Sequence, residues 1–285
     1  MHFASQEALR DSAELVGTLT RIKPDFMDRL SDLTEHSVSN DSRLAEAYEN
    51  AAWLIPKPSE GQRGVVLMIG NGGFETASSM LPPEYPFIVC DRSASNLFVQ
   101  RIILETVRNH PTKKGFWGML NQFGEDFDGL LSRDEADVSR LSIGGSYDRQ
   151  QEYWGDASTV PYFLKSERTY RTARQSLLDR SVGFRHINLS LPHEVQAFAD
   201  DLCSQNTQVL GANATNAYAE GWAGPINSLE FARRIPFHPD AVVMDSVGGG
   251  GLVSVPFTLS EWIEAKQRYA RERGYTSRLL DNTIA

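Results

Sequence analysis

The hydrophobic positions of the chain follow two different spacings. Residues 5–54 carry apolar side chains at intervals of three or four, which predicts two or three amphipathic helices. The stretch 55–64 then contains two prolines and two glycines, a composition typical of a linker. Beyond it, short apolar runs rich in β-branched residues alternate with helical patterns, as in a doubly wound, mostly parallel α/β sheet. The sequence therefore predicts an N-terminal helical cap over residues 1–54 and a sheet domain over residues 64–285.

The sheet domain divides into predicted strands, predicted helices and one segment that fits neither pattern. Helical spacing covers residues 94–110, 165–181, 192–205 and 227–235. Short apolar runs typical of buried strands cover residues 65–69, 87–91, 182–190 and 241–246, and a further run begins at residue 207. The segment 110–160 mixes aromatic, acidic and glycine-rich stretches, and we expect it to form an insertion or lid.

A glycine turn follows the first predicted strand. Gly70, Gly72 and Gly73 lack side chains at the strand's carboxyl end, where an open α/β sheet leaves its ligand crevice. The second strand ends at Asp91, and an acid there can accept hydrogen bonds from both hydroxyls of a ribose. Glu75 stands where a dinucleotide fingerprint has its third glycine, and no lysine for a triphosphate follows. The pattern favours a nucleoside without phosphates, and a plain tight turn is the alternative.

The segments VVLMIGNGGFE and FIVCDRS resemble the first two motifs of class I S-adenosylmethionine (SAM) dependent methyltransferases. In that family the glycine turn lies under the methionine part of the cofactor and the acid binds the ribose. The resemblance therefore implies a Rossmann-like methyltransferase fold that binds S-adenosyl-L-methionine through Gly70, Gly72, Gly73 and Asp91. The family commonly has an acidic residue shortly before its first glycine, and this chain departs from the pattern with Met68.

Two further strand ends supply candidate site residues. Asn188 ends the third strand, where the family often places an acid that binds the adenine amino group, and a structural turn is the alternative interpretation. The fourth strand runs into Asn213, Asn216 and Tyr218, at the position from which the family's catalytic or substrate-holding groups project. The letters TNAY in this segment also resemble SAM enzymes that transfer an aminocarboxypropyl group to lipids. An Asx turn with a packed tyrosine is the alternative here.

Groups that could assist the reaction are less well defined. An aromatic cluster in the inserted segment could attract a sulfonium through the ring quadrupoles, although aromatic side chains at this density are more often ordinary packing. A general base is needed only if the acceptor is protonated. The cluster consists of Tyr147, Tyr153, Trp154 and Tyr162, and the candidate bases are Asp156, His186, Asp245 and Tyr218.

Composition excludes several classes of protein. The net charge of -9 argues against a large nucleic-acid surface, and the pair at 113–114 is too little to supply one. The two cysteines, Cys90 and Cys203, are expected in the core and cannot form a disulfide framework, and the six histidines lack metal-ligand spacing. No apolar run approaches membrane-spanning length. We expect a soluble, cytoplasmic protein without a metal, a nucleic-acid partner or a membrane partner.

These patterns predict a SAM-dependent transferase acting on a small molecule, most simply a methyltransferase. One alternative is a SAM enzyme that attacks the aminocarboxypropyl portion of the cofactor, by transfer or by internal cyclisation, and releases methylthioadenosine. Another is a non-catalytic nucleoside-binding module. We expect the helices of residues 1–54, together with the aromatic insertion, to close over the cofactor and form the acceptor pocket, and packing on a sheet face is the alternative. The sequence leaves the acceptor and the oligomeric state open.

Overall fold

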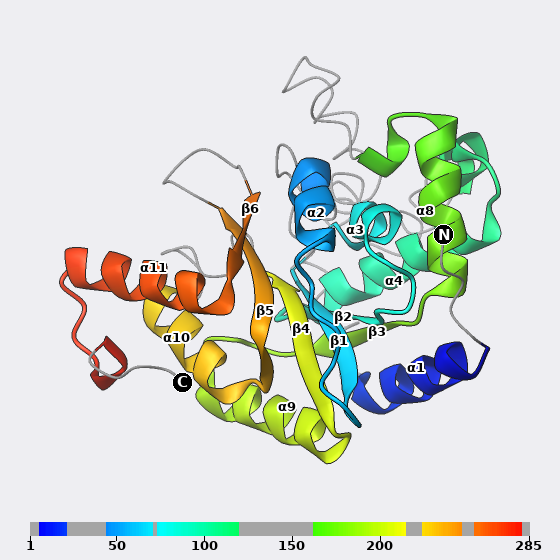
Figure 1. Ribbon diagram of the computed structural model, residues 1–285. Helices are drawn as coiled ribbons and strands as arrows, with labels where there is room; N and C mark the ends of the chain where they lie inside the picture. The colour runs from blue at the N-terminus through cyan, green and yellow to red at the C-terminus, as the bar shows by residue number, and fades with distance from the viewer. Residues whose placement is uncertain are drawn as a thin grey trace, which may run out of the picture.

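A computed structural model describes residues 6–21, 44–70, 73–119, 162–214, 224–246 and 254–280. Within these ranges one sheet of six strands runs through the molecule in the order β3-β2-β1-β4-β5-β6 (Figure 1). Neighbours among β1 to β5 pair in parallel, and β6 pairs with β5 in antiparallel orientation. The strands are β1 (Arg63–Ile69), β2 (Phe87–Asp91), β3 (Val182–His186), β4 (Thr207–Asn213), β5 (Phe237–Ser246) and β6 (Ser254–Thr258). The predicted doubly wound, mostly parallel sheet is confirmed.

Helices flank the sheet, and four of them match the predicted segments of the sheet domain. The matching ones are α4 (Ala94–Asn109), α8 (Glu167–Asp179), α9 (Pro192–Ser204) and α10 (Gly224–Arg234). The others are α1 (Gln6–Leu19), α2 (Leu44–Ala52), α3 (Phe74–Met80), α11 (Leu259–Glu272) and the short 3₁₀ turns η3 (Tyr162–Leu164) and η4 (Arg278–Leu280). Most of the inserted segment, residues 120–161, lies outside the described residues.

The sequence patterns missed α3, β6 and α11. Pro256 lies within β6, and proline normally argues against a strand because it cannot donate a ladder hydrogen bond. The strand lies at the edge of the sheet, next to β5 alone, so one missing donor is tolerated there. Helix α11 begins immediately afterwards with a capping box, in which Thr258 and Glu261 each bond the other's backbone N–H.

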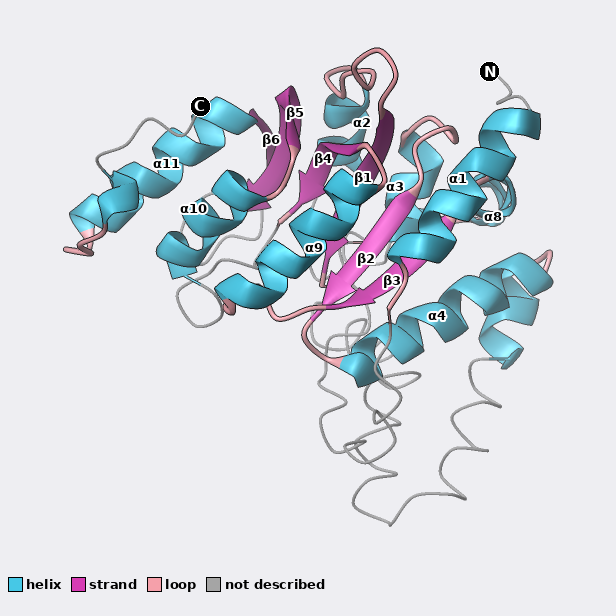
Figure 2. Cartoon of the chain, turned by 90° about the horizontal axis from the view of Figure 1, so that it is seen from below, coloured by secondary structure: helices cyan, strands magenta, loops and turns pink. Residues whose placement is uncertain are grey.

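Alternation along the strands creates two hydrophobic cores. Val66 and Met68 of β1 face one side of the sheet, and Val65 and Leu67 face the other. Helices α2, α3, α4 and α8 cover the first side, which we call the α8 face. Helices α1, α9, α10 and α11 cover the second, the α9 face, and Figure 2 shows α4 and α9 on opposite sides of the sheet. The result is a three-layer α/β/α arrangement.

Each of the two N-terminal helices belongs to one of these cores. Helix α1 packs on the α9 face through Leu15, Val16 and Leu19, while α2 packs on the α8 face through Ala47, Tyr48 and Ala51. The residues between them, 22–43, lie outside the described part of the chain. The two helices thus lie on opposite faces of the sheet, and the expected closure of residues 1–54 over a ligand stays a prediction.

The two cysteines have different environments. Cys90 is buried in β2, and burial raises the pKa of its thiol to about 12. Cys203 is exposed, so the expectation that both lie in the core is wrong for this residue. Helix α9 buries a stripe that ends at Leu202, and the next residue turns about 100° away from it.

None of the helices that the structure describes is both long and apolar enough to cross a bilayer.

Candidate ligand site at the carboxyl edge of the sheet

The carboxyl ends of the parallel strands meet at one edge of the sheet, and hydrogen bonds join three of them there. The amide of Gly70, just beyond β1, donates to the carbonyl of Cys90 at 2.7 Å. The amide of Ile187, just beyond β3, donates to the carbonyl of Asp91 at 2.8 Å. The glycine turn, the acid that ends β2 and the residues leading to Asn188 are therefore neighbours, as the sequence pattern requires.

The turn after β1 has a backbone that favours glycine. Gly70 has a φ of 69° and Gly73 a φ of 62°, both in the left-handed region that side chains strain. A Cβ atom on Gly70 would meet no described atom within 4 Å, so conformation, rather than space, calls for glycine there. Asn71 and Gly72, between the two, lie outside the described residues.

Asp91 lies beside this turn with a partly buried side chain. Its Oδ1 accepts a hydrogen bond from the amide of Ser93 at 2.8 Å, which orients the carboxylate at the start of α4. Strand alternation places Asp91 on the same face of β2 as Val89, the α8 face. The residue is thus oriented by its own backbone at the edge where a ribose would lie.

Asn188 builds a turn. Its side-chain Oδ1 accepts a hydrogen bond from the backbone amide of Ser190 at 3.0 Å, which forms an Asx turn. Its backbone amide donates to Glu194 Oε2 at 2.7 Å. This is the hydrogen bonding expected of a structural turn asparagine. The carbonyl oxygen has a second lone pair, so a contact with an adenine amino group is still compatible with the geometry.

Asn213 ends β4 and is completely buried. Its Nδ2 donates to the hydroxyl of Tyr48 at 2.7 Å, and this hydroxyl donates to the sulfur of Met68 at 3.4 Å. The amide therefore ties α2 to the ends of β1 and β4. Asn216 and Tyr218, the other predicted catalytic residues, lie outside the described part of the chain.

Replacing Tyr48 with phenylalanine tests this connection. We expect Tyr48→Phe to lower the free energy of unfolding by about 1–3 kcal/mol, because a buried amide donor loses its acceptor. Chemical denaturation measures the change. Tyr269→Phe, at a tyrosine that is more than a third exposed, is the matched control and should leave stability nearly unchanged. Equal stability of the two variants would contradict a structural role for this hydroxyl.

Met68 and Glu75 show how the site departs from the family pattern. Met68 is fully buried in the α8-face core, where a carboxylate would be surrounded by apolar side chains. Glu75 lies in the first turn of α3, two residues beyond Gly73, and its side chain is also buried. Burial raises the pKa of this carboxyl from 4.5 to about 7, against a smaller lowering by its own backbone amide. Among the described residues, no cation forms an ion pair with it. The start of α3, next to the glycine turn, therefore contains a carboxyl whose pKa lies near neutral pH.

Asp245 does not join this site. It follows Met244 in β5 and so faces the α9 side of the sheet, where it accepts hydrogen bonds from Trp262 and Lys266 of α11. His186 lies beside Asp91 in the register of β2 and β3, and its Nε2 lies 2.9 Å from the carbonyl of Arg92.

The remaining candidate bases and aromatic residues fall outside the side chains that the structure describes. Asp156, Tyr147, Tyr153 and Trp154 fall within 120–161, and for Tyr162 the structure describes only the backbone. Within the described ranges, no group of three His, Cys, Asp or Glu side chains is arranged to bind a metal ion.

Comparisons with known proteins place the chain only distantly. The sequence matches no protein-family model and no curated protein. Among solved structures, it is similar to the rRNA methyltransferase aviRa from Streptomyces viridochromogenes, with 14% identity over 93% of this chain and 98% of that chain. The TM-score is 0.42, and a likeness at this level is too distant to transfer an activity.

Proposed function

We propose that the protein is a SAM-dependent transferase, most simply a methyltransferase. The observation that carries this proposal is the placement of Asp91 beside a glycine turn of left-handed backbone, joined to it through the bond from Gly70 to Cys90. A backbone without side chains lets a ligand approach closely, and a carboxylate beside it binds ribose hydroxyls.

The chain's own residues divide the work of binding. Asp91 holds the ribose, the turn from Gly70 to Gly73 lies under the methionine part, and Asn188 accepts from the adenine amino group. Glu75 provides negative charge for the cationic end of the ligand. It thereby replaces the acidic residue that the family commonly has at the position of Met68. When bound, SAM supplies a carbon activated by a positive sulfur. The residues around it then mainly need to align the acceptor with that carbon and to exclude water.

The acceptor predicted from the sequence is a small molecule, and the helices of residues 1–54 with the inserted segment are proposed to cover it. Asn213, Asn216 and Tyr218 are proposed to hold the acceptor or assist the transfer. Incubation with SAM followed by mass spectrometry distinguishes the chemistries. S-adenosylhomocysteine indicates methyl transfer, and methylthioadenosine indicates attack on the aminocarboxypropyl portion.

Substitution of Asp91 tests the cofactor site. We expect Asp91→Ala to weaken SAM binding by about 10- to 150-fold, because charge-assisted hydrogen bonds of roughly 1.5–3 kcal/mol are lost. Asp91→Asn keeps an acceptor for the amide of Ser93, so its SAM affinity should lie between those of the unmodified protein and Asp91→Ala. Isothermal titration calorimetry gives the affinities. Asp240→Ala, which removes an acid whose side chain is 83% exposed, is the control. Unchanged affinity in a folded Asp91→Ala protein would remove the ribose assignment.

A second candidate function is a nucleoside-binding module without catalysis. The burial of Asn213 against Tyr48 supports it, because the one described residue among the predicted catalytic groups is occupied in the core. SAM binding without any nucleoside product, across a panel of acceptors, would favour this function over the transferase.

A further inference from the structure

The chain's negative charge is unevenly distributed. Residues 94–119 and 162–180 together contain nine of the 28 Lys and Arg residues but three of the 37 Asp and Glu residues. These two segments are therefore net positive in a protein whose formal charge is -9. Neither segment is strongly basic when read alone, and the 42 residues that separate them include several acids.

Hydrogen bonds bring the two segments side by side on the outside of the α8 face. Arg108 of α4 donates to the carbonyls of Leu177 and Arg180, at 3.0 and 2.9 Å. In return, Arg174 of α8 donates to the carbonyl of Arg108 at 2.9 Å. Lys113 donates through Nζ to the carbonyl of Leu164 at 3.1 Å. Helix α4, residues 113–119 and α8 thus lie side by side.

We define the basic face by its exposed or half-exposed cations, after setting aside those whose charged groups are used inside the fold. Arg180 is buried, and Arg108, Lys113 and Arg174 bond backbone carbonyls. Acidic neighbours balance this face only in part, since Glu167 pairs with Arg171 at 3.2 Å and Glu105 with Arg108 at 3.6 Å. The five residues of the basic face are Arg101, Lys114, Lys165, Arg168 and Arg171.

We propose that the basic face binds the phosphate backbone of a nucleic acid. Three of its five cations are arginines, whose guanidinium groups bind phosphate oxygens in pairs. They project from packed helices, so binding orders little backbone. A membrane surface fits less well, because interfacial helices need a large apolar face beside the cations, whereas Met119 and Leu178 are the exposed large apolar side chains described in these segments.

The position of the basic face connects it to the sheet edge. Helix α4 begins three residues after Asp91, and exposed Arg92 lies between them. A strand bound along α4 and α8 would therefore extend towards the carboxyl edge. If the proposed transferase activity holds, its acceptor is then a nucleic acid rather than the small molecule predicted from the sequence. The net charge of -9 argued against a nucleic-acid surface because it averages the basic face with the acidic remainder.

Binding is tested with a fluorescein-labelled, single-stranded RNA of about 20 nucleotides and mixed sequence, by fluorescence anisotropy without SAM. We expect saturable binding at about 50 mM salt, with log K falling linearly as log salt rises. The triple variant Lys165→Gln, Arg168→Gln, Arg171→Gln should bind at least about tenfold more weakly and reduce the salt slope by about 2, since each lost phosphate contact contributes about 0.7.

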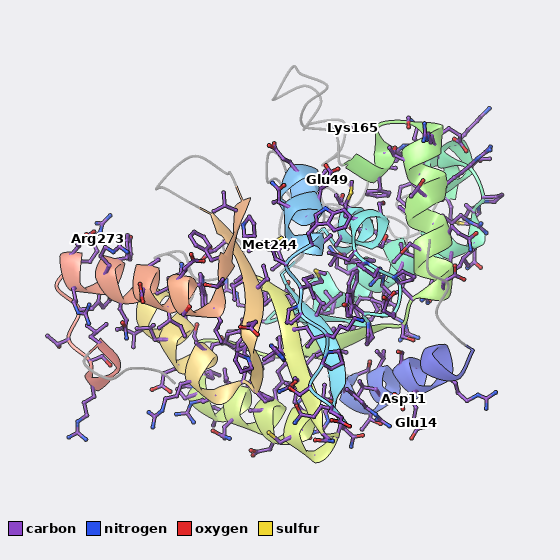
Figure 3. All side chains as sticks on the ribbon, in the orientation of Figure 1. Asp11, Glu14, Glu49, Lys165, Met244 and Arg273 are labelled. Carbon is purple, nitrogen blue, oxygen red and sulfur yellow. The ribbon has the colours of Figure 1, made fainter. Side chains whose placement is uncertain are left out.

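The control removes the same charge elsewhere. Arg268→Gln, Arg273→Gln, Arg278→Gln changes exposed cations of α11, its C-cap and η4. Figure 3 shows Arg273 at the far left, well separated from Lys165 at the top right of centre. This variant should bind RNA nearly as the unmodified protein does. Both variants should keep the same unfolding midpoint.

Three outcomes would overturn the proposal: no RNA binding at low salt, equal weakening by both triple variants, or binding of anionic lipid vesicles without binding of RNA. DNA of the same sequence distinguishes the two sources of the phosphate backbone, and either one supports the proposal. Because no SAM is present, failure here leaves the cofactor proposal untouched, and loss of SAM binding leaves this one untouched.

Discussion

Asp245→Ala should lower the free energy of unfolding by about 3–5 kcal/mol, the largest change expected of any single substitution considered. Asp245 Oδ2 accepts from the indole N–H of Trp262 at 2.7 Å and lies 2.6 Å from Lys266 Nζ. Asp245 and Trp262 are both buried, and Lys266 is mostly so. Removing the carboxylate leaves the ammonium without this counter-charge in a poorly solvated position. Chemical denaturation followed by circular dichroism measures the loss.

Two further variants separate charge from hydrogen bonding. Asp245→Asn keeps an acceptor for Trp262 and removes only the charge, so its loss should be smaller. Arg171→Ala breaks an exposed ion pair and should change stability by no more than about 0.5 kcal/mol. If Asp245→Ala costs less than Arg171→Ala, the carboxylate does not hold α11 on the sheet.

Glu75→Gln should stabilise the protein by up to about 3 kcal/mol at pH 8 and by less than about 1 kcal/mol at pH 5. Burial raises the pKa of Glu75 from 4.5 to about 7, so between these values the folded protein binds a proton that the unfolded chain has released. This group's contribution to stability is present below pH 4.5 and is lost as pH rises to about 7. Above that, the folded state contains a buried carboxylate, and neutral glutamine avoids its cost.

Denaturation series at pH 5, 6, 7 and 8 test this dependence. Glu60→Gln makes the same change in net charge at an exposed position and serves as the control. A difference between Glu75→Gln and the unmodified protein that is constant over this range would contradict the raised pKa. A cationic ligand bound at the glycine turn would favour the charged form of Glu75, so SAM should bind more tightly as pH rises through 7, and Glu75→Gln should lose that trend.

The amino-acid sequence by itself determined most of the strands and helices of the sheet domain, and the candidate turn. Strand and helix periodicities are local, since each depends on which face of one element meets a core, and they sufficed for β1 to β5, α4 and α8 to α10. The glycine turn and Asp91 were also recognisable, because a left-handed backbone and a strand-end acid need particular residue types at fixed positions. β6 escaped because its proline is tolerated only at an edge, and edge position depends on the whole sheet.

Only the tertiary structure decided what the polar residues do. Asn213 and Tyr48 are far apart in sequence, and their hydrogen bond exists because α2 packs on the α8 face. The pKa of Glu75 depends on the helices around α3, which remove water from its carboxyl. The basic face forms because α4 and α8 pack together, although the first ends at Asn109 and the second begins only at Glu167. Burial, solvation and charge density are properties of neighbours in space, and sequence spacing fixes only neighbours along the chain.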